Sequence, residues 1–376
     1  MLNPDIPLTG GTEKLSFMNA ALGRLTSEIR ELRAELPELA WRRLRLSLRR
    51  ARANGEAWEA CMRYGAPLPA VERLLDYWCD ELDCRAAEAR LNALPWFERH
   101  AEGEALAFIH ARSGHEAALP LLWLHGASSS IVEGVHVVPE LTTAEKSDAF
   151  HVVCPALPGR PPRDRPGDDA LASVARRCGD LMAMLGYDRY VVHGSGLGAR
   201  VASELARLDT AHVVGLHVTA LRALPAPEEL ADLSADEKSR LLSMQELDAI
   251  ARQPGLRTPV EQLALAACQL ADEEREARLI HLAPELLWGL SYELLRSEPE
   301  FRQRLAQQEA RPLGPRSEVP TCVCSFPLGR ATLRRFAERA QRVVAWSEQD
   351  YGGELAALEQ PEVLQASLRS FCTAWR

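Results

Sequence analysis

A glycine-rich corner, Arg189 to Arg200, has the residue types of a nucleophile elbow, the strand–turn–helix corner that presents a catalytic side chain. The turn of such an elbow is tight and needs small residues two positions before and two positions after its apex. Gly194 and Gly198 meet this demand and place Gly196 at the apex. The position from which a nucleophile would attack therefore has no side chain.

Two other interpretations of this corner are weaker. An elbow centred on Ser195 would put His193 and Leu197 at the positions that need small residues, so Ser195 fits poorly as a displaced nucleophile. A Gly-x-Gly-x-x-Ala pattern starting at Gly194 resembles a dinucleotide-binding fingerprint. The corner follows the third apparent strand of its region rather than the first, and no acidic residue closes a following strand.

Short apolar runs alternating with amphipathic segments predict the elements that position this corner. Each run ends in a polar or turn-forming residue, as at His125-Gly126, and a helical pattern separates the later ones. This alternation is typical of a parallel sheet covered by helices on both faces. The predicted strands are 118–124, 151–154, 189–192, 212–218, 319–326 and 342–346, with helices over 168–185, 330–340 and 361–375.

The remaining segments are predicted to be helical. The pattern over residues 16–110 predicts an N-terminal helical block, and a second helical block lies between two strands of the sheet. An insertion there covers the carboxyl ends of the strands, where α/β sheets bind ligands. The sequence thus predicts a helical extension over 1–105, an α/β core over 106–221 and 315–376, and a lid over 222–314.

Composition limits the function classes. The net charge of −9 argues against a nucleic-acid partner, which calls for a basic face. Apolar runs stay below the roughly 18 residues of a membrane span, and Met1 to Met18 lacks the apolar stretch of a signal peptide. We therefore expect a cytoplasmic protein without a membrane span. The nine scattered cysteines are expected to be reduced and packed as small apolar groups.

Several motifs in order resemble the microsomal-type epoxide hydrolases, which have an N-terminal extension domain. The likeness spans about residues 40–376 and is weakest in the predicted lid. It implies an α/β-hydrolase fold, and the family habit suggests a homodimer. The segments that carry it are 80–92, 108–113, 121–126 with Glu133, 150–159, 213–217 and 351–361.

The same resemblance exposes a missing catalytic triad. Members of that family attack an epoxide with an aspartate at the elbow apex, release the ester with a histidine–acid pair, and hold the epoxide oxygen with lid tyrosines. Here the apex is Gly196, the acid position after Phe-Pro is Gly329, and the base position after Gly-Gly is Glu354. The lid has one tyrosine, Tyr292. Without a nucleophile there is no ester for a base to release, so hydrolysis by that route is not expected.

The residues left at these positions define the candidate site. Glu354 is a candidate general acid or base if its surroundings are apolar, and otherwise a solvated carboxylate. Tyr292 is either a lid donor or a packed aromatic residue. Ser195 is more simply a small residue tolerated in the turn.

The His-Gly loop adds backbone donors and hydroxyl groups. The N–H groups of Ala127 and Leu197 are placed to form an oxyanion hole, unless the loop is vestigial. Ser128 offers a hydroxyl group beside that loop. His125 and His193 are expected to be structural, bonding loop backbone.

The family pattern has Trp, Asp, Trp and a carboxylate at four positions where this chain has the smaller residues Ala127, Gly196, Leu197 and Gly329. This difference leads to the hypothesis of an enlarged pocket for a bulky, apolar, polycyclic molecule. The favoured function is a repurposed enzyme that opens, cyclises or joins such a natural-product intermediate by positioning and acid/base catalysis. No metal ion or cofactor is implied. A carrier without catalysis and a hydrolase with a relocated triad are the alternatives.

Overall fold

The computed structural model describes most of the chain from residue 29 to residue 376. The ranges outside the description are 1–28, 65, 102–103, 127–128, 145–147, 158–168, 226, 243–259, 262, 265–283, 294–295, 297–300, 302–303, 306, 309–312 and 328–332.

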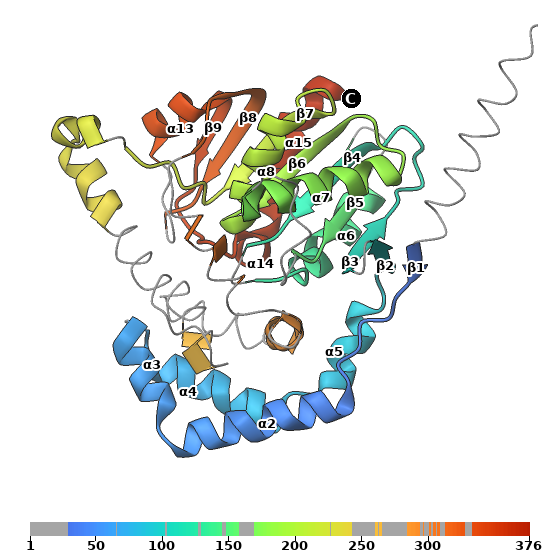
Figure 1. The fold of residues 1–376 in the computed structure, drawn as a ribbon, viewed down its shortest axis with the longest axis vertical. Coiled ribbons are helices and arrows are strands. Elements are labelled where there is room, and N and C mark those ends of the chain that lie inside the picture. Colours follow the sequence, from blue (N-terminus) through green and yellow to red (C-terminus); the bar gives the residue numbers. More distant parts are fainter. Residues whose placement is uncertain are drawn as a thin grey trace, which may run out of the picture.

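A single sheet of nine strands forms the centre of the molecule, in the order β1-β2-β3-β5-β4-β6-β7-β8-β9 (Figure 1). β1, β2, β3 and β5 pair antiparallel, and all pairs from β5 through β4 to β9 are parallel. The predicted mostly parallel sheet is confirmed. The strands are β1 (Ile29–Glu31), β2 (Trp96–Ala101), β3 (Glu104–Ala111), β4 (Leu119–Leu124), β5 (Phe150–Pro155), β6 (Tyr190–Ser195), β7 (Val213–Thr219), β8 (Ser317–Ser325) and β9 (Gln341–Glu348).

Helices cover both faces of the sheet, and the period-two pattern of the strands explains why. In β4, Leu121 and Trp123 pack in one apolar cluster, whereas Leu122 and Leu124 pack in the cluster on the other side. The first cluster includes α6 (Glu133–Thr143) and α15 (Pro361–Cys372); the second includes α7 (Ala170–Met184), α8 (Leu197–Leu208) and α13 (Arg334–Ala340).

The prediction of a wholly helical block over 16–110 is wrong at residues 29–31, 96–101 and 104–110, which lie in strands of the central sheet. The boundary at residue 105 therefore falls inside the β2–β3 hairpin. β2 lies near the sheet edge, and only Trp96 and Phe97 precede its polar residues Glu98, Arg99 and His100, so no apolar run marks it. The helices of the N-terminal extension lie between strands β1 and β2 of this sheet and do not form a separate helical unit.

The N-terminal extension consists of short helices whose apolar sides face inward. In α2 the buried residues Trp41, Leu44 and Leu48 recur at helical spacing, and arginines occupy much of the remaining surface. Figure 1 shows these helices on the side of the molecule away from α7 and α8. They are α2 (Glu38–Ala53), α3 (Glu56–Tyr64), α4 (Leu68–Asp76), the π-helical turn Tyr77–Glu81 and α5 (Cys84–Leu91).

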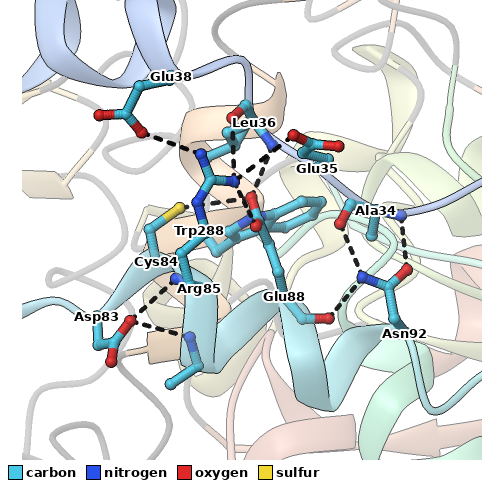
Figure 2. A network of polar contacts seen from close by, with 11 residues as sticks. Ala34, Glu35, Leu36, Glu38, Asp83, Cys84, Arg85, Glu88, Asn92 and Trp288 are labelled. Atoms are coloured by element: carbon cyan, nitrogen blue, oxygen red, sulfur yellow. Dashed lines mark hydrogen bonds and ion pairs between the residues drawn. The ribbon is translucent and has the colours of Figure 1, made fainter.

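A buried carboxylate on α5, Glu88, ties the extension to the predicted lid (Figure 2). It accepts hydrogen bonds from the Leu36 amide at 2.7 Å, from Arg85 Nη1 at 2.6 Å and from Trp288 Nε1 at 3.3 Å. Trp288 belongs to the helix of residues 284–293, which lies between the sheet and the extension (Figure 1). The ion pair of Arg90 with Glu285 adds a second link to the same helix. The extension thus holds this helix of the predicted lid in place.

The cysteines in the described ranges are all buried and unbridged, as expected. Cys322 and Cys324 alternate along β8 and pack in one apolar cluster. Among the described helices, none is both long enough and apolar enough to cross a membrane.

Candidate active site

The elbow has the predicted geometry. β6 ends at Ser195, α8 begins at Leu197, and Gly196 between them has φ +52° and ψ −117°, a conformation that side chains rarely adopt. A Cβ atom on Gly194 would lie 2.4 Å from the Gly198 carbonyl oxygen, and one on Gly198 would lie 2.1 Å from the Leu124 carbonyl oxygen. Both flanking positions therefore require glycine, and Gly196 is the apex.

The space where a nucleophile's side chain would begin is filled by Glu354. A Cβ atom built on Gly196 would lie 2.6 Å from Glu354 Oε1 and 3.5 Å from its carboxyl carbon. Glu354 is buried, with 3% of its surface exposed. The structure thus brings Gly196 and Glu354 together, although they are far apart in sequence, and the predicted gain of pocket volume at Gly196 is not found. The glycine instead admits a carboxylate from another loop.

Two local features hold Glu354 in place on the loop between β9 and α14 (Ala356–Glu359). Gly352 has φ +117°, and a Cβ atom there would meet Phe326 Cδ1 at 2.5 Å, so the loop can pass only with glycine. The Ser195 hydroxyl donates a hydrogen bond to the Glu354 carbonyl oxygen at 3.0 Å. Ser195 is buried and positions the loop, and its contact favours the interpretation as a turn residue over that as a nucleophile.

The Glu354 carboxylate lies at the N-terminus of α8, because Gly196 is the residue that precedes this 12-residue helix. Free N–H groups and the positive end of the helix dipole favour an anion there. Leu197, the first residue of α8, is buried at this point and supplies one of those N–H groups. A carboxylate at this position can act as a proton acceptor when it is ionised.

His125 on the loop after β4 is structural in its contacts, as expected. Its Nδ1 donates to the Gly126 carbonyl oxygen at 2.8 Å, and its Nε2 accepts from the Leu157 amide at 3.0 Å. Both ring nitrogens thus bond loop backbone. The neighbouring residues Ala127 and Ser128, and Gly329 on the loop after β8, lie outside the described residues, so their predicted roles stay predictions.

A buried histidine pair lies beneath the elbow. His193 Nδ1 and His217 Nδ1 are 2.9 Å apart, and Trp123 packs against the His193 ring with centroids 4.0 Å apart. Burial lowers the pKa of His193 well below its usual value and that of His217 to about 3. Both rings are therefore neutral at pH 7 and serve as packed polar groups, and His193 bonds His217 on β7 where a bond to loop backbone was expected.

Tyr292 lies on the face of helix 284–293 that contacts the N-terminal extension. It stacks on Trp288 with ring centroids 5.1 Å apart and lies under the Arg296 guanidinium. Burial raises the pKa of the Tyr292 phenol, and its hydroxyl has no hydrogen-bond partner among the described residues. These contacts favour the packed-aromatic interpretation over that of a lid donor.

The same helix reaches the His-Gly loop through a glycine. A Cβ atom on Gly289 would lie 2.3 Å from Ser130 Oγ and 3.0 Å from both Val132 methyl carbons. Ser130 itself has φ +72°. Gly289 therefore permits the close contact between the insertion and the loop beside the elbow.

Replacing Gly289 by alanine is expected to destabilise the protein by about 1–3 kcal/mol and to lower turnover, because the added methyl group displaces Ser130 and Val132. The matched control is Gly179→Ala within α7, where the nearest atom is the flexible end of Leu205 at 3.2 Å. Thermal unfolding of both variants measures the effect. A Gly289→Ala variant as stable as the control would contradict this packing.

The sequence motifs include Glu133, at the start of α6, but its burial near the elbow was not predicted and it was given no role. The available signal was an acidic residue eight positions after His125 that precedes the apolar residues Val135, Val137 and Val138. Within the described ranges, His, Cys, Asp and Glu side chains do not gather in groups of three that could hold a metal ion.

Comparison with known proteins decides the family. Residues 29–134 match the family described as epoxide hydrolase N terminus. A candidate epoxide hydrolase of Stigmatella aurantiaca (strain DW4/3-1) is 31% identical over 333 residues, which cover 81% of this chain and 76% of the relative. The chain belongs to the epoxide hydrolase family. The resemblance inferred from the motifs is thereby confirmed.

Solved structures of epoxide hydrolases show the same fold. The Aspergillus niger epoxide hydrolase has a TM-score of 0.70 and 25% identity, with 92% of this chain and 96% of that chain covered. The juvenile hormone epoxide hydrolase of the silkworm Bombyx mori has a TM-score of 0.67 and 20% identity, with 93% and 96% covered. The α/β-hydrolase fold is therefore confirmed.

Proposed function

We propose that this member of the epoxide hydrolase family is an enzyme that opens an apolar epoxide with Glu354 as general base and without a covalent intermediate. The observation that supports it is the position of the Glu354 carboxylate, whose Oε1 lies 2.6 Å from where the Cβ of a residue at the apex would be. A carboxylate thus stands at the apex of the elbow, supplied by a different loop.

The proposed reaction balances with Glu354 alone as the proton carrier. The ionised carboxylate takes a proton from a water molecule while the water oxygen bonds to an epoxide carbon and the ring C–O bond breaks. The epoxide oxygen, now an alkoxide, takes up a proton, and Glu354 releases the one it received. A hydroxyl group of the substrate can replace the water, in which case the product is a cyclic ether. Positioned acid/base groups of this kind contribute about 100- to 10,000-fold to a rate.

Proton transfer fits this carboxylate better than nucleophilic attack does. An enzyme ester formed on Glu354 would need a second base to release it. Of the nearest described histidines, His125 has both ring nitrogens bonded to backbone, and the buried His193 bonds His217 through Nδ1 and has its pKa lowered well below the usual value by burial. A non-covalent reaction needs no such group. The suggestion of a natural-product intermediate as substrate stays a prediction from sequence.

Turnover of a bulky apolar probe, cis-stilbene oxide, separates an enzyme from a carrier. The proposal expects product to accumulate beyond one equivalent of protein, measured by chromatography. Saturable binding of the probe with no product over the same period would contradict the proposal and favour a carrier.

A further inference from the structure

A second buried carboxyl group, Glu133, lies directly behind the His-Gly loop. It is the first residue of α6 and has 1% of its surface exposed. Its Oε2 accepts from Trp123 Nε1 at 3.3 Å, and its Oε1 is 3.4 Å from the Gly126 amide and in hydrogen-bond contact with Ser129 Oγ. The side chain therefore connects strand β4, the loop that follows it, and α6.

Only one layer of backbone separates Glu133 from the elbow. A Cβ atom on Gly126 would lie 3.9 Å from Glu133 Oε1 and 3.6 Å from the Ser195 carbonyl oxygen. Ser195 in turn bonds the Glu354 backbone. The loop at Gly126 is thus held between one carboxyl group and the corner that holds the other.

The groups facing Glu133 offer it no positive charge. They are Trp123 on β4, Ser129 on the loop, Cys154 on β5 and Glu354 from the loop after β9. No lysine, arginine or histidine in the described part of the chain forms an ion pair with Glu133. Burial and, to a smaller extent, the Glu354 carboxyl group raise the pKa of Glu133, the hydrogen bonds from Ser129, Trp123 and Gly126 lower it, and the net pKa is about 7.

We propose that Glu133 works as a neutral carboxylic acid, which holds the His-Gly loop through Ser129 and leaves Glu354 as the single negative charge among the described residues of the elbow. The Ser129 hydroxyl links Glu133 to the His-Gly loop, because it also lies 3.3 Å from the Gly126 carbonyl oxygen. A proton on Glu133 can donate to Ser129 Oγ while the Ser129 proton is donated to that carbonyl. Glu133 is thus a positioning residue, and this inference rests on the proposed role of Glu354.

Ionisation of Glu133 is expected to reduce catalysis for two reasons. It turns the single Ser129 proton toward the carboxylate and so removes the hydrogen bond from Ser129 to the Gly126 carbonyl oxygen, and it places a second negative charge near the oxygen that becomes an alkoxide during ring opening. Activity should therefore decline as pH rises through about 7.

The decisive variant is Glu133→Gln, which keeps the size of the side chain and stays neutral at every pH. With cis-stilbene oxide as probe, the wild-type kcat/KM is expected to fall about tenfold for each pH unit above the Glu133 pKa, and this decline should be absent in the variant. Glu140→Gln, at an exposed position of the same helix, is the matched control and should retain it. The same decline in Glu133→Gln, or its absence from the wild type, would overturn the proposal.

Stability provides a readout that needs no substrate. The folded-state pKa of about 7 lies above the usual 4.5, so the Glu133 contribution to stability is complete below pH 4.5 and is lost as pH rises through 7. The melting temperature of Glu133→Gln relative to the wild type should therefore rise between pH 4.5 and pH 8. A constant difference would contradict the protonated state even if turnover of the probe fails, and a rising difference without turnover would contradict only the proposed reaction.

The wild-type protein can be tested without any substitution. Its infrared difference spectrum between about pH 6 and pH 8 is expected to lose the band of a protonated carboxyl group. A spectrum that shows no such loss would also overturn the assignment.

Discussion

Replacing Glu354 by glutamine is expected to lower kcat/KM by about 100- to 10,000-fold, with KM changed by no more than a few-fold. Glutamine preserves the size of the side chain at the apex but cannot accept the proton that the reaction releases. The expected loss therefore falls on kcat, and the melting temperature should change little. Steady-state kinetics on cis-stilbene oxide and thermal unfolding measure the two quantities.

Glu362→Gln is the matched control for this variant. Glu362 is exposed in the first turn of α15, eight residues further along the chain, and has no place in the proposed site. It should behave as the wild type. Equal turnover by Glu354→Gln and Glu362→Gln would remove Glu354 from the reaction.

Replacing Gly196 by alanine is expected to destabilise the protein and abolish turnover. The new methyl group would lie 2.6 Å from Glu354 Oε1, and the residue would keep a φ of +52° that side chains rarely adopt. The carboxylate must then leave the apex, which removes the base from its position. Chemical unfolding and turnover of the same epoxide probe measure both effects.

A double-mutant cycle separates the collision from the backbone strain. In the Glu354→Ala background the collision is gone, so Gly196→Ala should cost only the strain. The cost of the glycine substitution is therefore expected to be smaller by about 0.5–3 kcal/mol in that background, the range typical of residues in contact. Additive costs would show that Glu354 does not occupy the apex.

The sheet and its elbow could be predicted because their signals are local. Buried parallel strands appear as apolar runs, and the tight turn at the elbow needs Gly194 and Gly198 whatever the rest of the chain does. The β2–β3 hairpin at residues 96–111 could not be recognised in the same way. Its outer strand lies near the sheet edge and carries charged residues at solvent-facing positions, so the periodic apolar signal is weak.

Sequence could name Gly196 and Glu354 as candidate site residues, but it could not predict the contact between them. The loop position of Glu354 follows from the motif, whereas its placement on Gly196 depends on how two loops distant in sequence meet above the sheet. The direction of Tyr292 could not be predicted, because a tyrosine in an insertion is equally able to face the substrate or the extension. Only the stacking on Trp288 decides its direction. Glu133 was named only as part of a motif and given no role, because burial without a charged partner cannot be seen in sequence.

The origin of the oxygen atom added to the substrate tests most directly whether Glu354 acts as a base. A single turnover of cis-stilbene oxide, with protein in excess, is run in water labelled with heavy oxygen, and the product is analysed by mass spectrometry. Attack by a water molecule that Glu354 activates predicts that the first product formed already carries the label. An unlabelled first product, with the label appearing in the protein's Glu354 carboxyl group, would show a covalent ester and contradict the account.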